Sequence, residues 1–282
     1  LVADYCFMRD NEDEEITTVL VLRLYPAKAI LATVCPSKGV DDYVVARETH
    51  LVRDSGYLKL IYRSDQEPSL RALLERAFQK ASEAQLEQAV PEASAVGESQ
   101  SNGRAESSVL RIQDLVRTYK CALESRLSTR IPCNHPIFLW MVEHAASVYN
   151  RYVCTEDGST PYQNLHGQRF KGRAVEFAEQ VFYYVPKRLR SKMSLRWRLG
   201  TFVGNHQNSN EALVAASNGD VVKVRSIVRV VEPSRWVKEA VLNVKGTPVR
   251  LRPRSESDSD AHVEEHMDPH VNADQHPPED EV

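Results

Sequence analysis

The first third of the chain alternates between apolar, β-branched runs and polar stretches. Three such runs follow one another closely, separated by an acidic stretch and by Tyr25-Pro26, which predicts an antiparallel meander. The three predicted strands are residues 1–8, 16–24 and 29–34.

Amphipathic segments follow the meander. Residues 41–54 begin with two aspartates and carry apolar side chains at helical spacing, which predicts a helix. Residues 68–85 predict a second helix with a proline in its first turn, where helices accept one. A fourth strand is predicted at residues 58–62, and a fifth around residues 86–90.

Two longer helical patterns complete this part of the chain, at residues 101–127 and 135–152. Their apolar faces are interpreted as core. The order β-β-β-α-β-α-β-α fits a ribonuclease-H-like mixed sheet flanked by helices. We therefore predict an α/β domain over residues 1–152 and a connector over residues 153–174.

From residue 175 the pattern changes to short apolar runs separated by Pro, Gly and Asn. Asn218-Gly219 is a strong hairpin signal. Five strands in so short a stretch predict a small, SH3-like β-barrel over residues 175–235 that binds DNA. The five predicted strands are residues 181–185, 199–204, 212–215, 221–224 and 226–231. Residues 236–282 are predicted to form a flexible, disordered acidic tail.

Composition narrows the class of protein. The chain has 282 residues, 42% of them hydrophobic and 27% charged, which is ordinary for a soluble globular protein. The apolar runs are all shorter than the roughly 20 residues of a membrane span, so we expect no membrane association. The five cysteines form no CxxC pair, which favours a reducing compartment.

The net charge of −3 hides a strong asymmetry along the chain. Residues 1–100 carry 11 Lys and Arg against 17 Asp and Glu, whereas residues 101–254 carry 25 against 12. Residues 255–282 carry 10 Asp and Glu and no Lys or Arg. The middle of the chain therefore has the charge of a polyanion binder.

Three acidic residues stand at positions suited to a shared site. Asp4 lies in the first predicted strand, Asp65 at the end of the fourth, and Glu106 just after a Ser-Asn-Gly turn at the start of a helix. If the three carboxylates converged, cations would have to separate them. Two Mg²⁺ ions about 4 Å apart would do so and would support in-line displacement at phosphorus.

Short motifs around these acids resemble those of a known family, the retroelement integrases, and in particular the copia-type retrotransposon integrases. The resemblance rests on Asp4-Tyr5-Cys6-Phe7-Met8, Ser64-Asp65-Gln66-Glu67-Pro68 and Ser101-Asn102-Gly103-Arg104-Ala105-Glu106. The 40 residues between Asp65 and Glu106 are close to the family's spacing. Ser159-Thr160-Pro161-Tyr162 and Leu199-Gly200-Thr201-Phe202-Val203-Gly204 are similar to later segments of the copia-type proteins.

The resemblance implies a function for the three acids. Asp4, Asp65 and Glu106 would be the catalytic residues and would hold two Mg²⁺ or Mn²⁺ ions. The activity implied is phosphoryl transfer that joins the 3′ ends of element cDNA to target DNA. It would be carried out by a homo-oligomer in the nucleus, reached from a cytoplasmic virus-like particle.

The chain also departs from the family pattern. Gln66-Glu67-Pro68 follows the second aspartate, where the family commonly has Asn-Gly. The zinc module that normally precedes the core is not in this sequence, which suggests a fragment or a decayed copy of a polyprotein. Two other functions therefore stay open: a remnant that only binds nucleic acid, and a stand-alone ribonuclease-H-like nuclease.

A basic stretch in the second half is the main candidate for DNA contact, although such a run can also be an ordinary solvated face. Trp197 within it could stack on an exposed base. Asn102, Arg104 and Arg111 near Glu106 are further candidates, with ordinary capping or solvent-facing roles as the alternative. The cations of the basic stretch are Lys187, Arg188, Arg190, Lys192, Arg196 and Arg198.

Overall fold

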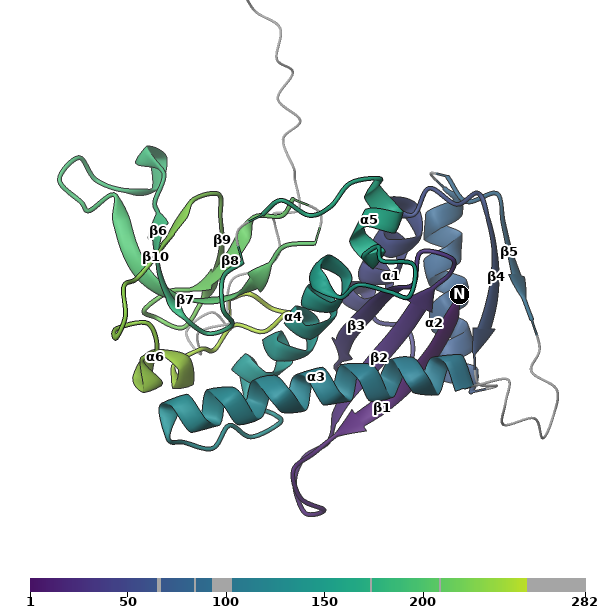
Figure 1. Cartoon of the computed structure of the whole chain (residues 1–282), viewed down its shortest axis with the longest axis horizontal. Coiled ribbons are helices and arrows are strands. Elements are labelled where there is room, and N and C mark those ends of the chain that lie inside the picture. Colours follow the sequence, from purple (N-terminus) through teal and green to yellow (C-terminus); the bar gives the residue numbers. More distant parts are fainter. Residues whose placement is uncertain (65–66, 84, 93–102, 173, 208, 253–282) are drawn as a thin grey trace, which may run out of the picture.

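The computed structural model describes residues 1–64, 67–83, 85–92, 103–172, 174–207 and 209–252. Two five-stranded sheets lie at opposite ends of the molecule, and two long helices run between them (Figure 1). None of the described helices is long and apolar enough to span a membrane.

The first sheet has the strand order β3-β2-β1-β4-β5. The first three strands along the chain pair antiparallel, as the meander pattern predicts, whereas β4 pairs with β1 in parallel and β5 pairs with β4 in parallel. The strands are β1 (Val2–Met8), β2 (Thr17–Leu24), β3 (Ala29–Cys35), β4 (Lys59–Ser64) and β5 (Gln88–Pro91). The predicted mixed α/β fold, with a five-stranded sheet flanked by helices, is confirmed.

Helices cover both faces of this sheet. One pair packs with the side chains of Ala3 and Tyr5, and the other with those of Cys6 and Met8, because successive strand residues point to opposite faces. The first pair is α1 (Asp42–Asp54) and α2 (Pro68–Ser82). The second pair is α3 (Gly103–Leu127) and α4 (Pro136–Tyr152).

The second sheet is antiparallel, with the order β10-β6-β7-β8-β9. All five strands expected from the short apolar runs are present. Their described pairings give a single order with β9 and β10 at its two ends, and the SH3-like barrel stays a prediction. The strands are β6 (Gln180–Tyr184), β7 (Trp197–Asn205), β8 (Ala212–Ala215), β9 (Val221–Val224) and β10 (Ile227–Arg229).

The second sheet packs directly on the α/β part. Val203 of β7 and Leu213 of β8 are buried in the same hydrophobic core as Trp140 and Ala146 of α4. The short helix α5 (Pro161–His166) lies in the connecting segment and also packs on α4. One continuous core therefore joins the two sheets through α4.

The segment after β10 folds back onto this core. It contains helix α6 (Lys238–Leu242), and Val241 and Val244 are buried with residues of α4. The indole Nε1 of Trp140 donates a hydrogen bond of 2.7 Å to the carbonyl of Gly246. Residues 236–252, which the sequence pattern assigned to a flexible tail, are thus held by packing and hydrogen bonds. Residues 253–282 lie outside the described residues.

Candidate active site and nucleic-acid interface

Asp4 lies on the face of β1 that α3 covers. Its neighbours on that face, Cys6 and Met8, share a core with Ile112 of α3, and its cross-strand partner Val21 belongs to the same core. Asp4 is only partly buried. Burial raises the pKa of the Cys6 thiol to about 12, and the negative charge of Asp4 adds to that shift. The strand register alone therefore turns this carboxylate toward α3.

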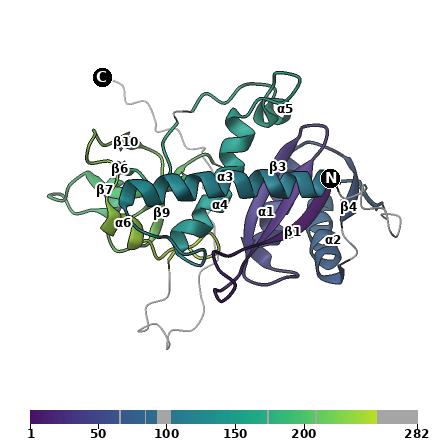
Figure 2. The ribbon, with the colours of Figure 1, turned by 60° about the horizontal axis from the view of Figure 1, so that its bottom comes forward.

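Glu106 lies in the first turn of α3 and is exposed. The start of this helix lies next to the start of β1, where Arg104 lines a surface hollow together with Leu1 and Val2. Figure 2 shows this end of α3 beside the N-terminus. Glu106 lies two positions after Arg104, and Asp4 lies two positions after Val2. The structure therefore brings their two elements together on one side of the sheet.

The third acid, Asp65, and the polar residue Asn102 lie outside the described residues. The last described residue of β4, Ser64, pairs with Ala3 in the parallel register. Among the described residues, no three His, Cys, Asp or Glu side chains are grouped so that they could hold a metal ion. Asp65 is not one of the described residues, so the predicted triad of Asp4, Asp65 and Glu106 stays a prediction. Carboxylates at a strand and at a helix start are the hard oxygen donors that Mg²⁺ prefers.

Arginines and tyrosines form a cluster beside these acids. The guanidinium carbons of Arg23 and Arg104 lie 5.2 and 5.1 Å from the centre of the Tyr25 ring. Arg111, two turns along α3, lies 5.5 Å from the centre of the Tyr149 ring. The Tyr149 hydroxyl accepts a hydrogen bond of 3.5 Å from Arg23. We call these five residues the arginine–tyrosine cluster.

The cluster includes one cation that the sequence analysis did not single out. Arg23 is on β2, and its Nε is buried without a hydrogen-bond partner among the described residues. A cation between Leu22 and Leu24 in an otherwise apolar strand was the available signal. Arg117, also on α3, has a different role, because it is exposed and pairs with Asp114 at 2.7 Å.

The basic stretch lies at the far end of the second sheet, in the turn η2 (Lys187–Leu189) and the segment leading into β7. Its cations make no ion pair among those found in the described residues, so their charges stay available. All are exposed except Arg190, which is half-buried. The six cations are Lys187, Arg188, Arg190, Lys192, Arg196 and Arg198.

Apolar side chains cover the outer face of the second sheet next to this stretch. Tyr184 and Trp197 are cross-strand partners whose rings meet edge to face at 5.5 Å. Phe182 pairs with Leu199 on one side and with Val228 of β10 on the other. All five are at least 37% exposed. Only Trp197 was a predicted contact, because the partners of the other four come from distant parts of the chain.

Comparison with known proteins gives only distant structural matches. No family model and no curated protein matches the chain. A simian T-cell lymphotropic virus intasome chain, solved with the PP2A regulatory subunit B56 gamma, has a TM-score of 0.42 and 15% identity, covering 82% of this chain and 79% of that chain.

Two integrase catalytic core domains match over a shorter region. The core of BIV integrase has a TM-score of 0.37 and 16% identity over 57% of this chain and 91% of that one. The core of HTLV-2 integrase with magnesium, in a dimeric form, has a TM-score of 0.38 and 10% identity over 58% and 94%. These likenesses are weak, so the site is interpreted from this chain's own residues.

Proposed function

We propose that this protein is a retroelement integrase of the copia type, which joins the 3′ ends of element cDNA to target DNA. The observation that carries the proposal is the position of two acids on one side of the first sheet. Asp4 faces α3 from β1, and Glu106 lies in the first turn of α3 beside the start of β1. Rigid secondary structure supports both carboxylates, as a site for phosphoryl transfer requires.

The surface next to the acids suits a DNA backbone. Arg104 and Arg111 lie over tyrosine rings and make no ion pair among those found in the described residues, where Arg23 also has a buried Nε without a hydrogen-bond partner. A phosphate approaching Asp4 and Glu106 would therefore meet positive charge. The basic stretch and the exposed Trp197 provide a second contact region, where stacking and phosphate contacts would act together.

The reaction proposed is a displacement at phosphorus. The 3′-hydroxyl oxygen of the cDNA forms a new P–O bond, the target phosphodiester loses its bond to the leaving 3′ oxygen, and the proton of the attacking hydroxyl ends on that oxygen. Asp4, Asp65 and Glu106 would hold two Mg²⁺ or Mn²⁺ ions. When bound, these would lower the cost of the negative charge that develops on the attacking and leaving oxygens. The arginine–tyrosine cluster would orient the DNA.

The remaining parts of the proposal concern the setting. An integrase joins two cDNA ends to one target, which favours a homo-oligomer, and its substrate is in the nucleus, which it would reach from a cytoplasmic virus-like particle. These proposals follow from the proposed activity and from the motif resemblance.

The test is a strand-joining assay on a labelled oligonucleotide, with cleavage and binding measured on the same DNA. We expect Glu106→Gln to abolish joining while DNA binding persists, because the carboxylate charge that would help to hold the metal ions is lost. Asp114→Asn is the matched control, since it removes an exposed acid from the same helix and should leave joining intact.

The outcomes separate the three candidate functions. Joining that survives Glu106→Gln would overturn the integrase proposal. Cleavage without joining by the unaltered protein would indicate a stand-alone nuclease. Binding of DNA with neither reaction, in Mg²⁺ and in Mn²⁺, would indicate a remnant that only binds nucleic acid.

A further inference from the structure

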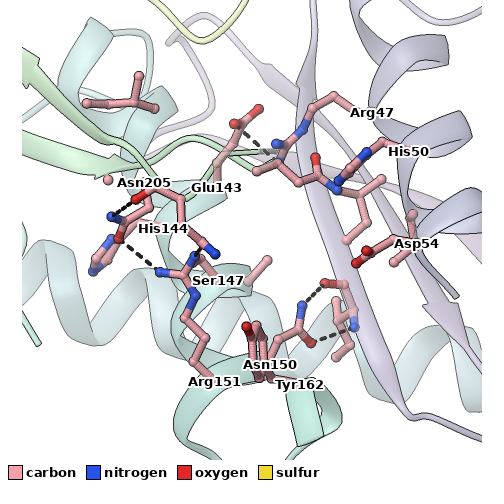
Figure 3. Close-up of a pocket in the computed structure, with 18 of the residues that line it drawn as sticks. Arg47, His50, Asp54, Glu143, His144, Ser147, Asn150, Arg151, Tyr162 and Asn205 are labelled. Atoms are coloured by element: carbon pink, nitrogen blue, oxygen red, sulfur yellow. Dashed lines mark hydrogen bonds and ion pairs between the residues drawn. The ribbon is translucent and has the colours of Figure 1, made fainter. Parts of the chain in front are cut away.

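A cavity of about 270 Å³ lies where the second sheet meets the α/β part. Its walls come from α1, α4, α5 and β7 (Figure 3). A water molecule takes about 30 Å³ of liquid volume, so this space is several times larger than a single water site. The cavity lies at the β3 edge of the first sheet, between α1 and α4, whereas Asp4 is on the central strand β1 and Glu106 is at the start of α3.

One cation in this cavity, Arg151, has no carboxylate partner among the described residues. Arg151 of α4 donates hydrogen bonds to the side-chain oxygens of Asn205 at 2.9 Å and Asn210 at 2.6 Å. Its guanidinium also lies 4.3 Å from the centre of the Phe170 ring. Burial lowers the pKa of Arg151, which reflects the cost of keeping a charge there without a counter-charge.

The acids of the cavity are already engaged. Glu143 accepts hydrogen bonds from the Tyr43 hydroxyl at 2.6 Å and the Thr33 hydroxyl at 2.9 Å, and Arg47 lies 3.3 Å from its other oxygen. Asp54 lies 3.5 Å from His166. Figure 3 shows Glu143 directed toward Arg47, whereas Arg151 is directed toward Asn205. Neither acid therefore neutralises Arg151.

Further polar side chains line the same space. The Nε of Arg47 is buried and has no hydrogen-bond partner among the described residues. Ser147 of α4, Tyr162 of α5 and His50 of α1 also line the cavity. A buried donor without a partner costs free energy that a bound acceptor would recover. The cavity thus combines an uncompensated positive charge with several donors.

We propose that this cavity binds the phosphate group of a small molecule, with Arg151 as the main counter-charge and the Arg47 guanidinium as a second donor. Two arginine forks suit a tetrahedral dianion better than a carboxylate, because a phosphate offers more acceptor oxygens. The phosphate would be inorganic phosphate or the 5′-phosphate of a nucleotide. The proposal does not depend on the proposed function, since it uses none of the residues of the candidate active site.

The experiment measures binding of inorganic phosphate and of deoxythymidine monophosphate by isothermal titration calorimetry at constant ionic strength. Deoxythymidine, which has no phosphate, is the ligand control. We expect saturable binding of at least one phosphate compound and none of the nucleoside. Arg151→Gln should weaken the binding at least about tenfold, as loss of a charge-assisted contact does. Arg225→Gln removes an exposed arginine outside the cavity and should not change it.

A second variant keeps the test decisive if Arg151→Gln does not fold. Arg47→Lys retains a positive charge for Glu143 but removes the guanidinium donors from the cavity wall, so we expect weaker phosphate binding. Saturable binding of phosphate alone would identify a free-phosphate site, and binding of both compounds a nucleotide-phosphate site. Absence of saturable binding, or equal affinity in the folded Arg151 and Arg47 variants, would overturn the proposal. Asp4→Asn should bind phosphate normally even if it joins no DNA.

Discussion

The two faces of the first sheet carry hydrophobic cores of different kinds. The core under α1 and α2 consists of residues from the α/β part. Leu165 of α5, from the connecting segment, packs at its margin. The core under α3 and α4 extends through Trp140 and Ala146 into Val203 and Leu213 of the second sheet. Asp4 faces this second, shared core. One hydrophobic core therefore joins the candidate active site to the candidate DNA-binding sheet. The core under α1 and α2 includes no described residue of that second sheet.

This difference indicates how the two faces serve the molecule. Residues under α3 and α4 hold the second sheet and the basic stretch in place relative to Asp4 and Glu106. Residues under α1 and α2 stabilise the first sheet, and their hydrophobic core includes no described residue of the second sheet. Changes in the core under α3 and α4 should alter both the stability of the protein and its DNA-joining activity. Changes in the core under α1 and α2 should alter stability alone.

The largest effect is expected from opposite-facing neighbours on β1. Asp4→Asn should lower the rate of DNA joining at least about a hundredfold, since it removes a charge at the proposed site. Tyr5→Phe, on the face toward α1, should leave the rate nearly unchanged. The measurement is single-turnover strand joining, with thermal unfolding to show that both variants are folded. Equal rates for the two variants would contradict the assignment of Asp4.

A smaller but still large effect is expected from truncations in the two cores. Phe138→Ala in α4 should lower the free energy of unfolding by about 3–5 kcal/mol, and Leu74→Ala in α2 should lower it by about 2–5 kcal/mol. Both side chains are almost completely buried. Hydrogen exchange separates them, because only Phe138→Ala should speed exchange of amides in β7 and β8. Unchanged exchange there would show that the shared core does not couple the sheets.

Glu48 gives a prediction about pH on the face covered by α1 and α2. Glu48 is a buried residue of α1, and neither of its carboxylate oxygens has a hydrogen-bond partner among the described residues. Burial raises its pKa from 4.5 to about 8. The folded state therefore takes up a proton that the unfolded state releases, and the free energy of unfolding falls as pH rises from 4.5 toward 8. Above pH 8 the carboxylate is ionised in both states and the penalty is complete.

The corresponding experiment is chemical denaturation as a function of pH. Between pH 4.5 and pH 7 the contribution of Glu48 amounts to roughly 3 kcal/mol by linkage. Glu48→Gln should remove this dependence and stabilise the protein at pH 8. Glu75→Gln, at an exposed position in α2, is the control and should retain the slope. A slope that persists in Glu48→Gln would assign it to other groups.

The elements of the fold could be predicted from the sequence because their signals are local. The nearly continuous apolar run in residues 1–8 indicates a strand between two apolar layers, and the turn at Asn218-Gly219 indicates a hairpin. A helix start at Gly103 places Glu106 in a first turn wherever the helix packs. These features depend on neighbouring residues only, so periodicity and turn chemistry suffice.

The parts that could not be predicted depend on distant contacts. Nothing near Val203 indicates that it is buried against α4 rather than inside a separate barrel. Arg23 and Tyr149 meet across 126 positions of the chain. The segment with Val241 and Val244 reads as a polar tail because its few apolar residues gain their burial from α4 and the second sheet, which are distant in the sequence. Pairing of distant segments decides such features, and a single sequence does not state it.

The smallest effect concerns two tryptophans on the shared side. The Nε1 of Trp140 donates to the Gly246 carbonyl at 2.7 Å, whereas the Nε1 of Trp236 is buried without a hydrogen-bond partner among the described residues. Trp140→Phe removes the indole donor of the Gly246 carbonyl. Trp236→Phe removes an N–H group that makes no hydrogen bond among the described residues, so no hydrogen bond is lost. We expect Trp140→Phe to cost about 1–2 kcal/mol more than Trp236→Phe in urea denaturation. Equal losses would show that the Trp140 hydrogen bond does not anchor the returning segment.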